Sequence, residues 1–186
     1  MPDASTKHYF AFEVPELSAF KRAVQEDVAR VLGIQPNKSR TPAHVTIKYR
    51  LELTKRDAAA ACAHMSAYVR NRKLLPIDVR VAGLGAFEDS RTLYVALDGA
   101  FVKAWRELVD EFTALGYPKQ KFEGSTPHVT LFSDLKVRQF PRVQRYLVAR
   151  SDFPTGTFSA RQLVLYRKVP TEDETYRWEP AHTLQF

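Results

Sequence analysis

The chain has 186 residues, of which 45% are hydrophobic and 26% are charged, and its formal net charge is +7. This composition is typical of a soluble globular protein, and no run of residues is long and apolar enough to span a membrane. The single cysteine, Cys62, excludes a disulfide framework and a thiolate metal site. No secretory signal is recognisable near the start, so we expect a cytoplasmic protein, and the excess of basic residues favours anionic partners.

Hydrophobic periodicity predicts a mixture of strands and helices along the chain. Expected strands carry apolar residues at every second position, and expected helices carry them at every third or fourth position. In chain order we expect strand 9–14, helix 16–32, loop 35–43, a strand from His44, helix 54–72, strands 77–83 and 93–97, helix 101–115, loop 117–127, a strand from His128, helix 137–149, and strands 157–169 and 176–186.

The order of these elements suggests two similar halves. The strand pair 77–83 and 93–97 is expected to close the first half, and the second half then repeats the order with a final strand pair. No linker rich in Gly or Ser separates the halves. We therefore expect residues 1–186 to form a single bilobal α+β domain, and we expect it to act as a monomer.

The most informative feature of the sequence is a short motif that occurs twice. The residues His-Val-Thr followed by an aliphatic residue begin at His44 and again at His128, 84 residues later. A proline shortly before each copy and the β-branched residues within it indicate strands. Side chains at i and i+2 of a strand share a face, so each histidine is paired with a threonine, Thr46 or Thr130. Two such pairs facing each other would hold a phosphate between two imidazoles.

The alternation continues beyond both copies and predicts which later side chains face the same site. Lys48 falls on the face of His44, where it is a candidate charge partner for a phosphate, and Tyr49 falls on the packed face. Phe132 falls on the face of His128, where its ring is a candidate for stacking on a base. A solvated lysine and a packed ring remain the ordinary alternatives for these two positions.

Basic residues lie near both copies of the motif. Lys38 and Arg40 precede the first copy, and Lys119 and Lys121 precede the second. This clustering favours an RNA end or a nucleotide as the partner, with Lys38 and Arg40 among the binding residues. Tyr166, in the last predicted strand pair, is a weaker binding candidate.

The other histidines lack the features of the motif. His64 lies in the predicted helix 54–72, where residues i and i+2 do not share a face, so we interpret it as a surface or packing residue of that helix. The motif histidines have no neighbouring His, Asp or Glu of the kind that a zinc site needs. We therefore expect neither a metal ion nor a cofactor.

On these residues the chain resembles the 2H phosphoesterase superfamily, in particular its bacterial branch of 2′-5′ RNA ligases and RNA 2′,3′-cyclic phosphodiesterases. The resemblance rests on the two His-Val-Thr copies and their separation, the opening strand 9–15 and the closing segment 163–166. It implies an α+β fold with two pseudo-symmetric lobes of antiparallel sheet, outer helices and a central groove. The segments 50–52 and 132–134 depart from the bacterial pattern, which leaves the substrate subtype open.

The resemblance implies a metal-independent phosphodiesterase. His44 and His128 would share the roles of general acid and base, in an order that the sequence does not assign, and Thr46 and Thr130 would donate hydrogen bonds to phosphate oxygens. The expected reaction is hydrolysis of a 2′,3′-cyclic phosphate at an RNA end or on a nucleotide. The alternatives are hydrolysis of 2′,5′-linked or cyclic signalling oligonucleotides, RNA 2′-5′ ligation, and a non-enzymatic RNA or nucleotide-binding module.

Overall fold

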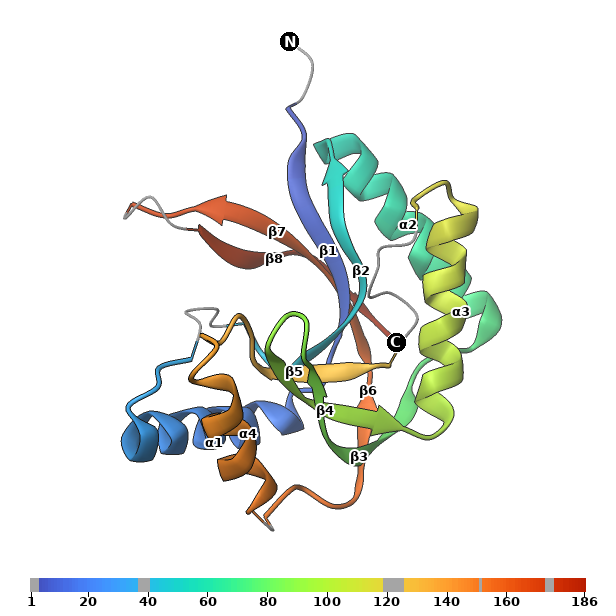
Figure 1. Ribbon diagram of the computed structural model, residues 1–186. Coiled ribbons are helices and arrows are strands. Elements are labelled where there is room, and N and C mark those ends of the chain that lie inside the picture. Colours follow the sequence, from blue (N-terminus) through green and yellow to red (C-terminus); the bar gives the residue numbers. More distant parts are fainter. Residues whose placement is uncertain (1–3, 37–40, 119–125, 151, 173–175) are drawn as a thin grey trace.

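The computed structural model describes residues 4–36, 41–118, 126–150, 152–172 and 176–186. They form two four-stranded antiparallel sheets with helices packed around them (Figure 1). No helix in these ranges has both the length and the hydropathy needed to cross a membrane. In chain order the elements are β1 (Thr6–Glu13), α1 (Glu16–Leu32), β2 (His44–Leu53), α2 (Lys55–Arg72), β3 (Ile77–Phe87), β4 (Thr92–Asp98), α3 (Ala100–Ala114), β5 (His128–Phe132), α4 (Phe140–Val148), β6 (Thr157–Ala160), β7 (Gln162–Pro170) and β8 (Tyr176–Gln185).

Each sheet carries one copy of the motif in an edge strand. The first sheet has the strand order β2-β1-β7-β8, and the second has the order β5-β4-β3-β6. The pair β1 and β2, connected by α1, corresponds to the pair β4 and β5, connected by α3, so the two sheets are pseudo-symmetric. The predicted α+β fold with two related antiparallel sheets is confirmed.

Two expectations about the strands are wrong. The strand pair β3 and β4 does not close the first half, because β4 pairs with β5 and both belong to the second sheet. The expected strand 157–169 is two strands, since the chain crosses from the second sheet to the first at Arg161, between β6 and β7. Periodicity indicates that a segment is extended, but it does not indicate which sheet the segment joins.

The ends of the helices follow local chemistry. The side chain of Thr54 accepts a hydrogen bond from the backbone N–H of Asp57 and caps α2. Gly33 ends α1 with a φ of 67°, which a glycine adopts without a steric penalty. Helix α4 begins at Phe140, later than expected, because Pro141 is tolerated in the first turn but not in a helix interior.

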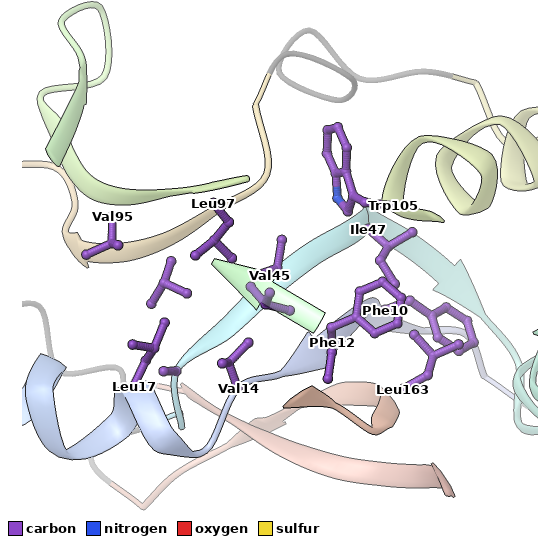
Figure 2. Packing of buried hydrophobic residues seen from close by; sticks show 14 of the residues in the cluster. Phe10, Phe12, Val14, Leu17, Val45, Ile47, Val95, Leu97, Trp105 and Leu163 are labelled. Atoms are coloured by element: carbon purple, nitrogen blue, oxygen red, sulfur yellow. The ribbon is translucent and has the colours of Figure 1, made fainter. Parts of the chain in front are cut away.

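One hydrophobic core joins the two sheets. Phe10 and Phe12 of β1 contribute to it from the first sheet and Leu97 of β4 from the second, and none of these side chains is more than 3% exposed. Figure 2 shows this packing, with Trp105 of α3 beside Ile47 of β2. Because the core is shared, the same packing holds both motif strands in place.

Candidate functional site

The two motif strands meet where the edges of the two sheets approach each other. Strands β2 and β5 are edge strands of different sheets, and they lie in contact. His44, Thr46, His128 and Thr130 are all half-buried, and the valine inside each motif is buried. Within each motif the histidine and threonine therefore share the open face, as predicted.

A β-bulge directly follows the first motif and reverses the alternation. The pairing of β2 with β1 skips Ile47, so Ile47 and Lys48 are both buried and Tyr49 turns to the open face. The prediction that Lys48 faces the site is therefore wrong. Lys48 is 1% exposed, and its Nζ donates to the carbonyl oxygens of Tyr117, at 3.4 Å, and Pro118, at 2.5 Å.

The second motif has a bulge at the same place. The pairing of β5 with β4 skips Leu131, and both Leu131 and Phe132 are buried in the core. Phe132 is only 1% exposed, so the prediction that its ring stacks on a base is wrong. Both errors have one cause: the bulge inserts a residue that a strict period of two does not include.

Side chains from two helices bind backbone carbonyls at the two bulges. Nε1 of Trp105, in α3, donates to the carbonyl oxygen of Thr46 at 2.9 Å. Nε2 of Gln25, in α1, donates to the carbonyl oxygen of Leu131 at 2.6 Å. A bulge interrupts the hydrogen bonds of the ladder, so these donors satisfy carbonyls at the positions where pairing is irregular. Neither residue was predicted from the sequence to act at the site.

Each motif imidazole makes the same hydrogen bond. Nδ1 of His44 lies 2.8 Å from the carbonyl oxygen of Pro42, and Nδ1 of His128 lies 2.8 Å from that of Thr126. A carbonyl oxygen only accepts, so Nδ1 carries the hydrogen, and Nε2 is the nitrogen that can take up or release a proton. His8 in β1 makes the same bond two residues back, so this bond is a local feature of these strands.

Burial lowers the pKa of both motif histidines. The pKa of His44 falls to about 4 because burial disfavours its charged form; the bond to Pro42 opposes this, and the charges of Lys21 and His128 lower the pKa further. Burial also lowers the pKa of His128, and its backbone bond opposes the change. Since the charge of one imidazole acts on the other, protonation of one disfavours protonation of its partner.

Lys21 of α1 is a cation beside the first motif, and it was not predicted from the sequence. Its Nζ donates to the carbonyl oxygen of Thr41 at 3.3 Å, and its charge acts on His44. Burial lowers the pKa of Lys21. The available signal was its spacing, because Lys21 and Gln25 follow the buried Leu17 at intervals of four residues and so share its helix face.

A pocket of about 100 Å³ opens beside His44. The ring centroid of Tyr9 lies 5.3 Å from that of His44 and 4.7 Å from that of Trp178. The prediction that Tyr49 lies on the packed face is wrong, because Tyr49 lines this pocket. Trp178 was not predicted at the site; it lies there because β8 pairs with β7 and β7 pairs with β1. The lining residues come from three strands and the segment before β2: Tyr9, Thr41, His44, Thr46, Tyr49 and Trp178.

Tyr166 lies behind this pocket. It is fully buried, its hydroxyl donates to the carboxylate of Glu13, and its ring stacks on Tyr9 with 4.8 Å between centroids. The prediction that Tyr166 contacts the substrate is therefore wrong, because no part of its ring is exposed. Its packing instead fixes the position of Tyr9.

Aromatic rings also surround His128, in a different arrangement. The centroids of Phe87 and Tyr94 lie 5.0 Å and 4.8 Å from that of His128. The Tyr94 ring lies directly over Gly85, where a Cβ atom would meet it at 2.3 Å. Only a glycine at position 85 leaves room for this ring against β3.

The remaining candidates lie outside the site or outside the described residues. His64 of α2 pairs with Glu111 of α3 at 2.6 Å, on the helical surface, as predicted. No group of three His, Cys, Asp or Glu side chains in the described ranges is arranged to hold a metal ion. Two predicted substrate-binding residues, Lys38 and Arg40, lie outside the described ranges. The same holds for Lys119 and Lys121, the basic residues before the second motif.

Comparisons with known proteins identify relatives of this fold. A family model described as the 2′-5′ RNA ligase superfamily matches residues 12–172. The structure is similar to Escherichia coli LigT complexed with 3′-AMP, at 15% identity over 98% of both chains and a TM-score of 0.63. It is also similar to TT0787 of Thermus thermophilus, at 16% identity over 96% of this chain and 97% of that chain and a TM-score of 0.60. LigT has also been solved with NADP+ and with ATP. None of the curated proteins compared with the chain matches it.

Proposed function

We propose that this chain, which belongs to the 2′-5′ RNA ligase superfamily, is a phosphodiesterase that opens 2′,3′-cyclic phosphates at RNA ends or on nucleotides. The observation that carries the proposal is the matched pair of imidazoles. In both His44 and His128, Nδ1 donates a hydrogen bond to a backbone carbonyl oxygen. The charges of the two rings also act on each other. A binding module needs positive charge, but it does not need two coupled groups that each keep one nitrogen for proton transfer.

The proposed reaction needs one neutral and one protonated histidine. The neutral imidazole takes a proton from water, and the protonated imidazole gives a proton to the ribose oxygen that leaves phosphorus. A bound phosphate anion favours the protonated form of a nearby imidazole, which counteracts the effect of burial. The hydroxyl groups of Thr46 and Thr130 donate to the non-bridging phosphate oxygens as charge develops there. The product is a phosphomonoester.

We assign Lys21 the electrostatic role that the sequence suggested for Lys48. Lys21 lies in α1 beside the segment that precedes β2, and its charge acts on His44. Lys48, in contrast, is buried on the face of β2 opposite to His44. A cation beside His44 attracts the anionic substrate and disfavours double protonation of the histidine pair.

The family description favours RNA 2′-5′ ligation as a second candidate. Ligation uses the same two imidazoles, but the nucleophile is a ribose hydroxyl in place of water. Hydrolysis is our first choice because water at high concentration competes with any hydroxyl in an open site. The two reactions differ in their products, so one assay separates them.

The test is a substrate panel with EDTA present throughout: 2′,3′-cyclic mononucleotides, RNA with a cyclic end, 2′,5′-oligoadenylate, cyclic dinucleotides, and RNA pairs suitable for ligation. We expect turnover of the cyclic ends to persist in EDTA and to be kept by His64→Ala, a matched histidine variant outside the site. Tight binding of RNA with no turnover of any panel member would favour the binding module. Loss of activity in EDTA and recovery with one added metal would contradict the metal-independent reaction.

A further inference from the structure

A line of aromatic rings leads from His44 toward the end of the hairpin formed by β7 and β8. Successive ring centroids are 5.3 Å apart from His44 to Tyr9, 4.7 Å from Tyr9 to Trp178, and 6.2 Å from Trp178 to Tyr176. Exposure rises along this line, from 3% at Tyr9 to 53% at Tyr176. Figure 1 shows the hairpin projecting beyond the other strands of the first sheet. The line therefore begins in the site and ends in solvent.

The register of the sheet explains why these rings share one face. Tyr176 and Trp178 are two residues apart in β8, so their side chains point the same way. Lys168 is the partner of Trp178 in β7 and joins them on that face. Tyr49, turned outward by the bulge in β2, lies 6.4 Å from Trp178 between centroids and is 41% exposed. These side chains, from three strands, form one surface, which we call the aromatic surface: Tyr49, Lys168, Tyr176 and Trp178.

Cations lie over the two most exposed rings of this surface. Nζ of Lys168 is 3.7 Å from the centroid of the Tyr176 ring, and the guanidinium carbon of Arg50 is 5.6 Å from that of Tyr49. Sites for single-stranded nucleic acid combine these two features, because bases stack on exposed rings while phosphates are drawn to adjacent charges. Tyr166, whose ring packs within the same sheet, is by contrast fully buried.

We propose that this aromatic surface is a track for single-stranded RNA on the 5′ side of the reacting phosphate. The base of the terminal nucleotide lies between Tyr49 and Trp178, in the pocket that His44 and Thr46 also line. The preceding base stacks on Tyr176. The inference rests on the proposed function in taking an RNA 3′ end as the substrate. It goes beyond that function because it makes an oligonucleotide, rather than a mononucleotide, the preferred substrate.

The test compares a 2′,3′-cyclic mononucleotide with a trinucleotide that has the same cyclic end. We expect kcat/KM of the wild type to be higher for the trinucleotide, and Tyr176→Ala to lower this length preference about tenfold, within the range for loss of one base stack. The matched control is Arg177→Ala in the same strand, whose side chain pairs with Glu179 at 2.5 Å; it should keep the full length preference.

A binding measurement separates failure of the track from failure of the proposed function. Quenching of Trp178 fluorescence by 3′-phosphorylated RNA needs no turnover, and the other tryptophan, Trp105, is only 3% exposed. Tighter binding of the trinucleotide than of the mononucleotide, reduced by Tyr176→Ala, would support the track even if no cyclic phosphate were cleaved. Equal binding of both lengths by the wild type, or an equal loss in Arg177→Ala, would overturn the track even in an active enzyme.

Discussion

The indole nitrogen of Trp105 donates a hydrogen bond of 2.9 Å to the backbone carbonyl of Thr46. This bond joins α3, the helix between β4 and β5, to the strand of the other sheet that carries the first motif. Thr46 is the last residue before the bulge, so the bond fixes the strand where its pairing becomes irregular. The position of the first motif therefore depends on a helix that precedes the second.

The variant Trp105→Phe keeps an aromatic ring in the core but removes the donor. We expect the free energy of unfolding to fall by about 1–3 kcal/mol, the usual cost of leaving a buried polar group unsatisfied. We also expect a lower kcat, because Thr46 and His44 share the strand that the bond positions. Urea unfolding and steady-state kinetics measure the two effects. Unchanged stability would show that the bond to Thr46 contributes nothing to the fold.

The sequence predicted the motif strands, and it predicted the pairing of each histidine with its threonine, because two residues of regular alternation are enough to define a face. It did not predict the bulges at Ile47 and Leu131. A bulge depends on pairing with a neighbouring strand, and no local pattern records it. For the same reason the periodicity placed Lys48 and Phe132 on the site face, although both are buried.

The sequence also could not identify residues that reach the site from distant parts of the chain. Trp178 of β8 approaches His44 only because β7 crosses over to pair with β1. Lys21 and Gln25 belong to a helix that packs near both motif strands. All of these contacts are between residues far apart in the sequence, so local patterns do not record them. The one available signal was the position of Lys21 and Gln25 on the helix face that also carries the buried Leu17.

Removal of the Lys21 charge should change the pH dependence of the reaction. The charge lowers the pKa of His44, so Lys21→Met should raise that pKa and move the acid limb of the kcat/KM profile to higher pH. KM should rise at the same time, because the substrate is an anion. Lys21→Arg keeps the charge and serves as the control. An acid limb at the same pH in Lys21→Met would contradict the role given to Lys21.

Lys48 should contribute to stability rather than to substrate binding. Its Nζ bonds to carbonyl oxygens of Tyr117 and Pro118, so Lys48→Met should lower the free energy of unfolding by about 2 kcal/mol. The salt dependence of KM should stay as in the wild type, since Lys48 is buried away from the open face that carries His44 and Thr46. A shallower salt dependence in Lys48→Met would restore Lys48 as a substrate-binding residue.

The lowered pKa values of three histidines should make the protein less stable in acid. The pKa of His44 is about 4 in the folded protein against 6.5 for an ordinary histidine, so the unfolded chain binds more protons between these values and stability falls as pH falls through this window. His128 and the buried His8, whose pKa values are also lowered, act in the same direction. We expect a lower urea midpoint at pH 5 than at pH 7, and a smaller difference in His44→Asn. An identical difference in that variant would exclude His44 as a source of the acid sensitivity.

Turnover of a 2′,3′-cyclic substrate by His44→Ala, His128→Ala and the double variant tests the two-histidine reaction most directly. Both imidazoles act in one step, so each single variant should lower kcat by at least about 10²-fold while the protein stays folded, and the double variant should be little worse than either one. The wild-type profile of kcat/KM should be a bell with its maximum below pH 6.5, since the pKa values of both histidines are lowered. A single variant that keeps more than about half of the wild-type rate would contradict the account.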